Sequence, residues 1–230
     1  MNEKLARKRT VRKRNRGGPR KRDSARTKET ILQAALVEFC RNGLDGARVD
    51  AITRRANANM RLLYHYFGDK NGLYLAVLEH VYAEIRAAEQ QLNLDNLDPV
   101  SAMRELLDFT FAFFQSHQDY IALLNNENLQ RGRYLRKSRK IAIMTRPMVA
   151  SVKRILSRGV EAGVFRRGVD PIQLFISITA FSYFHVSNRY TLSAMFDKDL
   201  TDPRWLKARR IHARDVLVTW LVTEARLFTA

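Results

Sequence analysis

The sequence predicts an all-α fold of about nine helices. Three observations favour this class: apolar residues recur at intervals of three and four along most of the chain, no stretch shows sustained alternation of apolar and polar residues, and Gly, Pro and Asn residues separate the periodic segments. The chain has 230 residues, of which 46 % are hydrophobic, enough for one compact unit or two small domains around a core. This composition excludes a globally disordered protein.

Residues 1–22 differ from the rest of the chain in charge. They hold eleven basic residues and one acidic residue, in a chain whose net charge is +18. Because this segment has almost no apolar side chains to bury and contains Gly17, Gly18 and Pro19 in succession, we expect a disordered basic arm. Such a charge indicates a polyanionic partner, with nucleic acid as the first candidate and an anionic membrane as the second.

Four helices are expected in the next part of the chain, over residues 24–42, 49–56, 60–67 and 70–92. Gly43 can adopt the left-handed conformation that ends the first helix. Asn57 lies where the turn after the second helix needs a positive φ, which Asn tolerates best after Gly. Asn59 and Asp69 can cap the third and fourth helices with their side-chain oxygens.

The periodicity remains helical beyond Pro99, and it predicts five more helices, over residues 99–116, 118–130, 134–162, 170–194 and 205–228. Gly132, Gly163, Gly168 and Pro203 separate these segments. Pro147 lies inside the third of them, and we expect it to kink that helix or to split it in two.

Cysteine and histidine usage excludes several classes of site. Cys40 is the only cysteine, so neither an intramolecular disulfide nor a cysteine-based zinc site is possible. The five histidines are scattered and show no HExxH spacing. No paired carboxylates, nucleophile–base pair or glycine-rich phosphate loop is evident, and we therefore expect no enzyme activity, no metal and no cofactor.

No apolar run reaches the roughly 18 residues needed to span a bilayer. The basic N-terminus also lacks the apolar core of a secretory signal. We therefore expect a cytoplasmic protein without a membrane partner.

Residues 49–70 carry the most informative pattern, a short helix, a three-residue turn and a second short helix. This is the order of a helix-turn-helix unit, whose second helix enters the DNA major groove. Leu63 and Phe67 are four residues apart and would face inward, so that the outward side chains are Met60, Arg61, Tyr64 and His65. Arg can bond to guanine, and Met and Tyr can pack on a thymine methyl group.

The run Leu63-Tyr64-His65-Tyr66-Phe67-Gly68-Asp69-Lys70, followed by Leu73, makes residues 27–80 resemble the DNA-binding domain of the TetR/AcrR family of bacterial transcriptional regulators. Gly43, Val49, Ile52 and Ala56 fit the same pattern. The resemblance implies a homodimeric repressor that binds double-stranded DNA at a palindromic operator and is released by a small-molecule effector. The motif that carries the resemblance is specific to the family, but it does not identify the effector.

The resemblance also implies roles for individual residues. Arg48 and Asn59 would lie at phosphates or at the groove edge. Bases would be contacted by Met60, Arg61 and Tyr64, and the DNA backbone by His65, Tyr66 and Lys70. This chain departs from the common family pattern at Arg48, at Asn57 and at residues 60–62, so the operator sequence cannot be predicted.

We divide the chain into the basic arm of residues 1–22, a helix-turn-helix DNA-binding domain of residues 23–72 and an effector-binding and dimerisation domain of residues 73–230. Within the last domain, the residues expected to line the ligand site are Phe109, Phe113, Tyr120, Phe181, His185 and Asn188. His185 is alternatively a core histidine. The face expected to form the dimer interface contains Val216, Trp220, Leu221 and Phe228, and packing within one subunit is the alternative.

Two questions remain open at this level. A sequence-independent DNA- or RNA-coating protein would also explain the net charge, and an activator or a ligand-independent regulator would have the same sequence pattern as a repressor. The arm would either enter the adjacent minor groove or add only non-specific affinity through counterion release.

Overall fold

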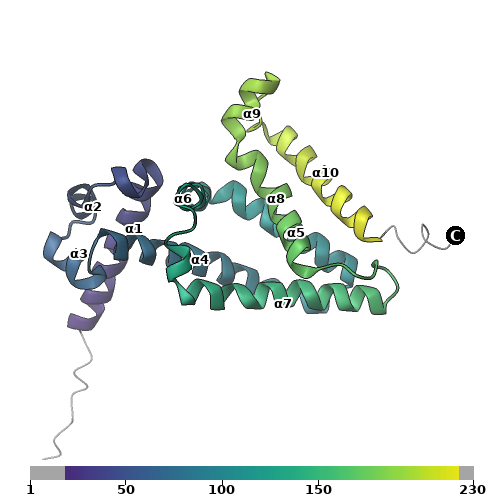
Figure 1. Cartoon of the computed structure of the whole chain (residues 1–230), viewed down its shortest axis with the longest axis horizontal. Helices are drawn as coiled ribbons and strands as arrows, with labels where there is room; N and C mark the ends of the chain where they lie inside the picture. The colour runs from purple at the N-terminus through teal and green to yellow at the C-terminus, as the bar shows by residue number, and fades with distance from the viewer. Residues whose placement is uncertain (1–18, 223–230) are drawn as a thin grey trace, which may run out of the picture.

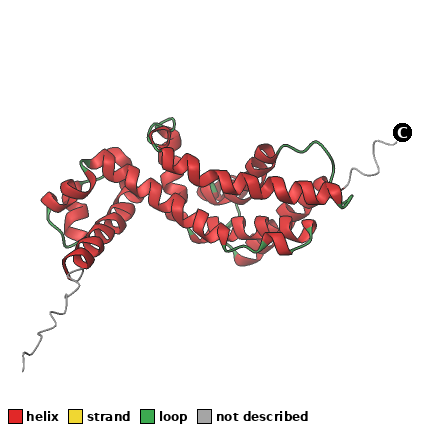
Figure 2. Cartoon of the chain, turned by 90° about the horizontal axis from the view of Figure 1, so that it is seen from below, coloured by secondary structure: helices red, strands yellow, loops and turns green. Residues whose placement is uncertain are grey.

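The computed structural model describes residues 19–222, and this part of the chain is all-α, as predicted (Figure 2). It contains ten α-helices: α1 (Pro19–Gly46), α2 (Val49–Arg55), α3 (Met60–Phe67), α4 (Lys70–Gln90), α5 (Pro99–Ser116), α6 (Gln118–Leu129), α7 (Arg139–Glu161), α8 (Pro171–Ser187), α9 (Arg189–Phe196) and α10 (Pro203–Val222). Two short 3-10 turns, η1 (Leu94–Asn96) and η2 (Leu135–Lys137), complete the described secondary structure. None of these helices has the length and apolarity to cross a bilayer.

The helices form two units that share α4 (Figure 1). The first unit contains α1, α2, α3 and the start of α4, and the second contains α5 to α10. α1 packs against both α4 and α6, while α7 packs against α4, α5 and α8. The domain boundary expected after residue 72 falls in the first turn of α4, so a continuous helix joins the two units.

The start of α1 corrects one expectation. The basic arm was expected to extend to residue 22, but α1 begins at Pro19. Pro fits the first turn of a helix, where its missing N–H has no partner to lose. The remainder of the expected arm, residues 1–18, lies outside the described residues.

The helix expected over residues 134–162 begins later than predicted. Residues 135–137 form a 3-10 turn, and Ser138 caps α7 by accepting a hydrogen bond from the Ile141 N–H at 3.2 Å. Pro147 does not split α7, which continues from Arg139 to Glu161. Proline removes one backbone donor there, a loss that the helix accommodates because it is packed against three neighbours.

The segment expected to be one helix over residues 170–194 is two helices, which is why the count rises from nine to ten. The break is at Asn188, whose side-chain amide donates to the Phe184 carbonyl at 3.0 Å and thereby competes with the backbone ladder. The last helix begins at Pro203 and not at residue 205, because Asp202 accepts hydrogen bonds from the Arg204 and Trp205 N–H groups.

An aromatic cluster joins the two units. Tyr74 of α4 is fully buried and meets Phe39 of α1 and Tyr134 edge-on, each with ring centroids 5.1 Å apart. Beside it, the Cys40 thiol donates to the Asp119 carbonyl of α6 at 3.4 Å, and burial, followed by the charge of Asp119, raises the pKa of this thiol to about 12. Cys40 is therefore a packing residue and not a reactive thiol.

Glu127 holds the turn between α6 and α7 in place. Its side chain is almost fully buried, and its Oε1 accepts the N–H groups of Tyr134 and Leu135 at 2.6 and 2.9 Å. The Tyr134 hydroxyl in turn donates to Asn71 at the start of α4 at 2.8 Å. Through these hydrogen bonds α6 is connected to the N-terminal end of α4, which belongs to the first unit.

Candidate nucleic-acid interface and ligand cavity

The turn between α2 and α3 has the conformation that the sequence predicts. Asn57 has a φ of 48°, in the left-handed region, and Asn59 is extended. The Oδ1 atom of Asn59 accepts a hydrogen bond from the Leu62 N–H at 2.8 Å and caps α3. The expected positive φ of Asn57 and the expected cap by Asn59 are confirmed, and the two residues shape the turn that joins α2 to α3.

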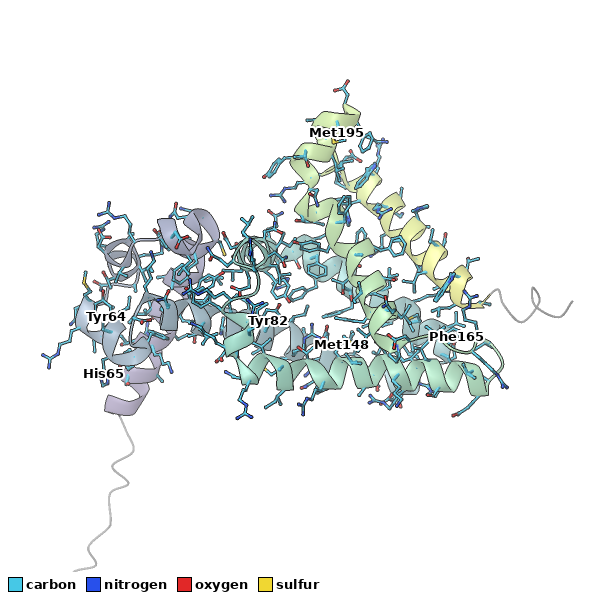
Figure 3. All side chains as sticks on the ribbon, viewed as in Figure 1. Tyr64, His65, Tyr82, Met148, Phe165 and Met195 are labelled. Carbon is cyan, nitrogen blue, oxygen red and sulfur yellow. The ribbon has the colours of Figure 1, made fainter. Side chains whose placement is uncertain are left out.

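α3 has one buried and one exposed face. Leu63 is fully buried, and Leu62, Tyr66 and Phe67 are partly buried against the same core. Met60 and Tyr64 remain 44 % and 43 % exposed, and Arg61 and His65 are exposed beside them. Figure 3 shows Tyr64 and His65 at the end of the molecule remote from α8 to α10. An apolar, basic and aromatic surface on a short exposed helix can contact base edges.

Two residues at the base of α3 bind α1. The Tyr66 hydroxyl lies 2.9 Å from Ser24 Oγ, and the Lys28 ammonium lies 5.7 Å from the centre of the Phe67 ring. Lys70, at the start of α4, donates to the Asp45 carbonyl at 3.1 Å. These contacts hold the C-terminal end of α3 and the start of α4 against α1.

Arg48, which precedes α2, and Arg54, in its last turn, share the carboxylate of Asp50. Arg48 Nε lies 3.2 Å from Asp50 and Arg54 Nη1 lies 3.0 Å from it. Partial desolvation raises the pKa of Asp50, but the hydrogen bonds and charges of the two arginines outweigh this effect and lower the pKa below its usual value. Both guanidinium groups remain largely exposed and retain donors for a phosphate.

Sequence reasoning missed two residues that fix this unit. Glu38 is buried on α1, where its Oε1 accepts the Arg48 N–H at 3.1 Å and the Asn42 amide at 3.0 Å. The sequence indicates this role only by placing an acidic residue on the apolar face of the first helix. Gly72 lies where an added Cβ would be 2.1 Å from the Phe67 carbonyl oxygen, so the end of α3 approaches α4 too closely for any other residue. The sequence indicates this close approach only by placing a glycine one turn after the residue that caps α4.

A cavity of about 510 Å³ lies between α4, α5, α6, α7 and α8. Most of its lining is apolar or aromatic, and its polar lining includes Tyr82, Arg86, Glu89 and Tyr120. A second cavity, of about 700 Å³, lies between the 166–170 turn, α8 and α10. Within residues 19–222, no cluster of His, Cys, Asp and Glu side chains could hold a metal ion.

The six residues expected to line a ligand site do not line one cavity, although the Phe113 ring is in contact with the rings of Phe109 and Tyr120. Tyr120 lines the first cavity and Phe181 the second, while neither cavity is lined by Phe109, Phe113, His185 or Asn188. Phe113 stacks on His117 with centroids 3.9 Å apart. His185 is buried and stacks on Phe111 at 4.7 Å, and burial, with the charge of Arg209 second, lowers its pKa to about 4. His185 is therefore a neutral core histidine, the alternative that the sequence left open.

The face expected to form a dimer is partly exposed. Val216 and Trp220 are 41 % and 49 % exposed, but Leu221 is fully buried in the core of its own subunit and cannot contribute to such a face. Phe228 lies outside the described residues. Further apolar residues of α8 and α10 are exposed that the sequence did not indicate: Ile172, Ile176, Phe184, Ile211 and Val222.

Comparison with known proteins gives consistent results for both units. Residues 31–77 match the family described as bacterial regulatory proteins, tetR family, and residues 99–217 match the tetracyclin repressor-like C-terminal domain. The chain is 36 % identical over 185 residues to the HTH-type transcriptional repressor NicS of Pseudomonas putida, an alignment that covers 80 % of this chain and 87 % of NicS. It is 35 % identical over 111 residues to the HTH-type transcriptional repressor SCO4008 of Streptomyces coelicolor, covering 48 % and 54 %.

Solved structures show the same fold at lower identity. The transcriptional regulator SCO4942 of Streptomyces coelicolor superposes with a TM-score of 0.63 at 22 % identity, covering 85 % of this chain and 98 % of that one. The regulator FadR of Bacillus subtilis, solved in complex with stearoyl-CoA, superposes with a TM-score of 0.64 at 17 % identity, covering 84 % and 98 %.

The contact between α3 and α4 leads to a test. We expect Gly72→Ala to lower the free energy of unfolding by about 2 kcal/mol or more, because its Cβ would overlap a backbone carbonyl that cannot rotate away. Gly46→Ala is the matched control, since a Cβ there meets only the Asn42 Cβ at an ordinary 3.5 Å, and alanine favours a helix by up to about 1 kcal/mol. Urea denaturation measures both. Equal stability of Gly72→Ala and the wild type would contradict the close approach.

Proposed function

Because this chain belongs to the TetR family of bacterial regulatory proteins, whose members are DNA-binding transcriptional regulators and not enzymes, we propose that it is a homodimeric repressor. It binds a palindromic operator in the cytoplasm and leaves it when a small-molecule effector binds. The observation that carries the proposal is α3 itself, which buries Leu63 fully and leaves Met60 and Tyr64 exposed on its opposite face. A sequence-independent coating protein does not need such a helix.

Base contacts come from the first turns of α3. Arg61 supplies paired donors for guanine, and Met60 and Tyr64 supply apolar contacts for thymine methyl groups. Asn59 caps the helix and leaves its positive end directed at the DNA. The backbone contacts come from Arg48, His65, Tyr66 and Lys70, and these fix the register without reading the sequence.

A single eight-residue helix makes few base contacts, so the repressor needs two copies. Two recognition helices about one DNA turn apart read the two halves of a palindrome. The exposed apolar side chains of α8 and α10 support a dimer through these helices, since together they offer a face that the described part of the subunit does not cover.

The cavity is connected to α3 through α4. Tyr82, Ile85 and Arg86 of α4 line the cavity, and the first turn of the same helix contacts α3 at Gly72. α6 provides a second connection, because Tyr120 lines the cavity while Asp119 contacts Cys40 of α1. An effector that prefers a different placement of α4 or α6 changes the spacing of the two α3 helices and weakens DNA binding by its differential affinity.

Selection of bound duplexes from a random double-stranded DNA pool, at near-physiological salt, tests sequence reading. We expect the wild type to enrich an inverted repeat and Arg61→Ala to bind that repeat about 10- to 100-fold more weakly, since a bidentate contact to guanine contributes about 1–3 kcal/mol. Arg154→Ala, which removes an exposed arginine of α7, is the control and should bind like the wild type. If the wild type enriches no sequence, the repressor proposal is wrong.

Deletion of residues 1–18 distinguishes the arm from α3. These residues carry eight basic side chains, and their removal should flatten the dependence of log K on log salt while the selected repeat remains the same. Because α1 begins at Pro19, the deletion leaves the first unit complete. An unchanged salt dependence in a DNA-binding measurement would show that the arm does not contact DNA.

The dimer face is tested by Val216→Glu. A carboxylate at this exposed position of α10 is present twice in a symmetric interface, and we expect it to convert the dimer to a monomer in analytical ultracentrifugation. Leu129→Glu, at an 82 % exposed leucine at the end of α6, is the matched control and should leave the dimer intact. A Val216→Glu protein that remains dimeric would move the interface away from α10.

A further inference from the structure

The cavity between α4 and α8 contains a buried ion pair with unused hydrogen-bonding capacity. Arg86 Nη1 lies 2.8 Å from Glu89 Oε2, and the two side chains are only 9 % and 8 % exposed. The two atoms are at ion-pair distance but are not aligned for a hydrogen bond. Within the described residues, neither they nor Arg86 Nε has a hydrogen-bond partner. A buried guanidinium with unpaired donors is costly unless a further anion completes its coordination.

The rest of the lining suits the body of an apolar molecule. Phe114, Leu124, Ile141 and Phe175 contribute apolar walls, and the Phe175 ring centre lies 5.9 Å from the Arg86 guanidinium carbon. The hydroxyls of Tyr82 and Tyr120 interact with each other and with the Arg86 charge. Figure 3 shows Tyr82 at the centre of the molecule, between the helix-turn-helix unit and the C-terminal helices.

We propose that this cavity binds a small, mainly apolar carboxylic acid as its carboxylate, with the carboxylate on the unpaired donors of Arg86 and the apolar body against Phe114 and Phe175. The inference rests on the proposed function in taking the cavity as the effector site. A volume of about 510 Å³ is within the range of sites for small ligands. A phosphate group is disfavoured, because its second negative charge would meet one guanidinium that Glu89 already partly neutralises.

Glu89 competes with the ligand for Arg86. Burial raises the pKa of Glu89 to about 7, although the Arg86 charge acts in the opposite direction. The titratable groups that face it are Arg86 and Tyr82 on α4, Tyr120 on α6 and Arg136 of η2, and the lining residues of α5, α7 and α8 are uncharged. A second carboxylate next to Glu89 raises its pKa further, so binding takes up a proton, and affinity increases as the pH falls toward about 7 and levels off below it.

Calorimetric titration of the full-length protein tests the ligand class. The probes are benzoate, 2-naphthoate and octanoate, each compared with its neutral primary amide. We expect at least one acid to bind at least about tenfold more tightly than its amide, because the amide cannot form the charge-assisted bonds to Arg86. If no acid binds to the folded protein, or if the amides bind as tightly as the acids, the proposal is wrong.

Two variants of the pair should have opposite effects, which a purely structural role would not produce. Arg86→Met should weaken binding of the acid at least about tenfold, whereas Glu89→Gln should strengthen it and remove its dependence on pH. Arg154→Met disrupts an exposed pair between Arg154 of α7 and Asp95 of η1 and is the matched control, expected to bind like the wild type. Wild-type affinity in Arg86→Met would overturn the proposal.

Removal of one partner of a buried pair can prevent folding, so circular dichroism and melting temperature accompany each titration. The double variant Arg86→Met with Glu89→Gln contains no unpaired charge, and it should fold and fail to bind the acid. Binding of the acid by this variant would also contradict the role of Arg86. If the protein selects an operator but binds no acid, only this inference is wrong. If it binds an acid but selects no DNA sequence, the repressor proposal is wrong and the cavity assignment stands.

Discussion

The packing around Tyr74 is the contact on which the rest of the arrangement depends. Its fully buried ring touches Phe39 of α1 and Tyr134 of the turn after α6, so three segments that are distant in the sequence meet at one side chain of α4. Two aromatic contacts of this geometry each add about 0.5–1.5 kcal/mol beyond the burial of their area. They make α4 a rigid element, with the helix-turn-helix unit at one end and the cavity at the other.

Three buried acidic side chains, Glu38, Glu127 and Glu89, differ in the hydrogen bonds that they accept, and this difference distinguishes the two that hold the fold together from the one that lines a cavity. Glu38 and Glu127 both accept backbone N–H groups, and these bonds hold the start of α2 and the turn before α7. Within the described residues the Glu89 carboxylate accepts no backbone N–H and faces an arginine whose donors are also incompletely used, whereas the unpaired Oε2 of Glu127 belongs to a carboxylate that is already bonded through Oε1. Buried charges in a folded protein are normally satisfied, so the exception is the informative one. It lies in the wall of a cavity, where a ligand can supply the missing partner.

The sequence predicted the parts of the structure that follow local rules. The positive φ of Asn57, the caps at Asn59 and Asp69 and the buried position of Leu63 each depend on neighbours within one or two helical turns. The break at Asn188 was missed because its side chain competes with the helix at a position where apolar periodicity continues. The cavity lining could not be predicted, since apolar residues that line a cavity have the same spacing as those that fill a core. Arg86 has no sequence signal, because its burial depends on α7 and α8.

Asp50 has a consequence for how the protein finds its site on a chromosome. It holds Arg48 and Arg54 in exposed ion pairs before any DNA is present, so the phosphate contacts available to these arginines would be made by groups whose charge Asp50 already offsets in part. Attachment to random DNA depends mainly on phosphate contacts, whereas attachment to the operator also uses the bases. In the proposed repressor, a counter-charge at α2 would therefore weaken attachment to random DNA while the reading of bases stays with α3, so that less time is spent on random sequence between visits to an operator.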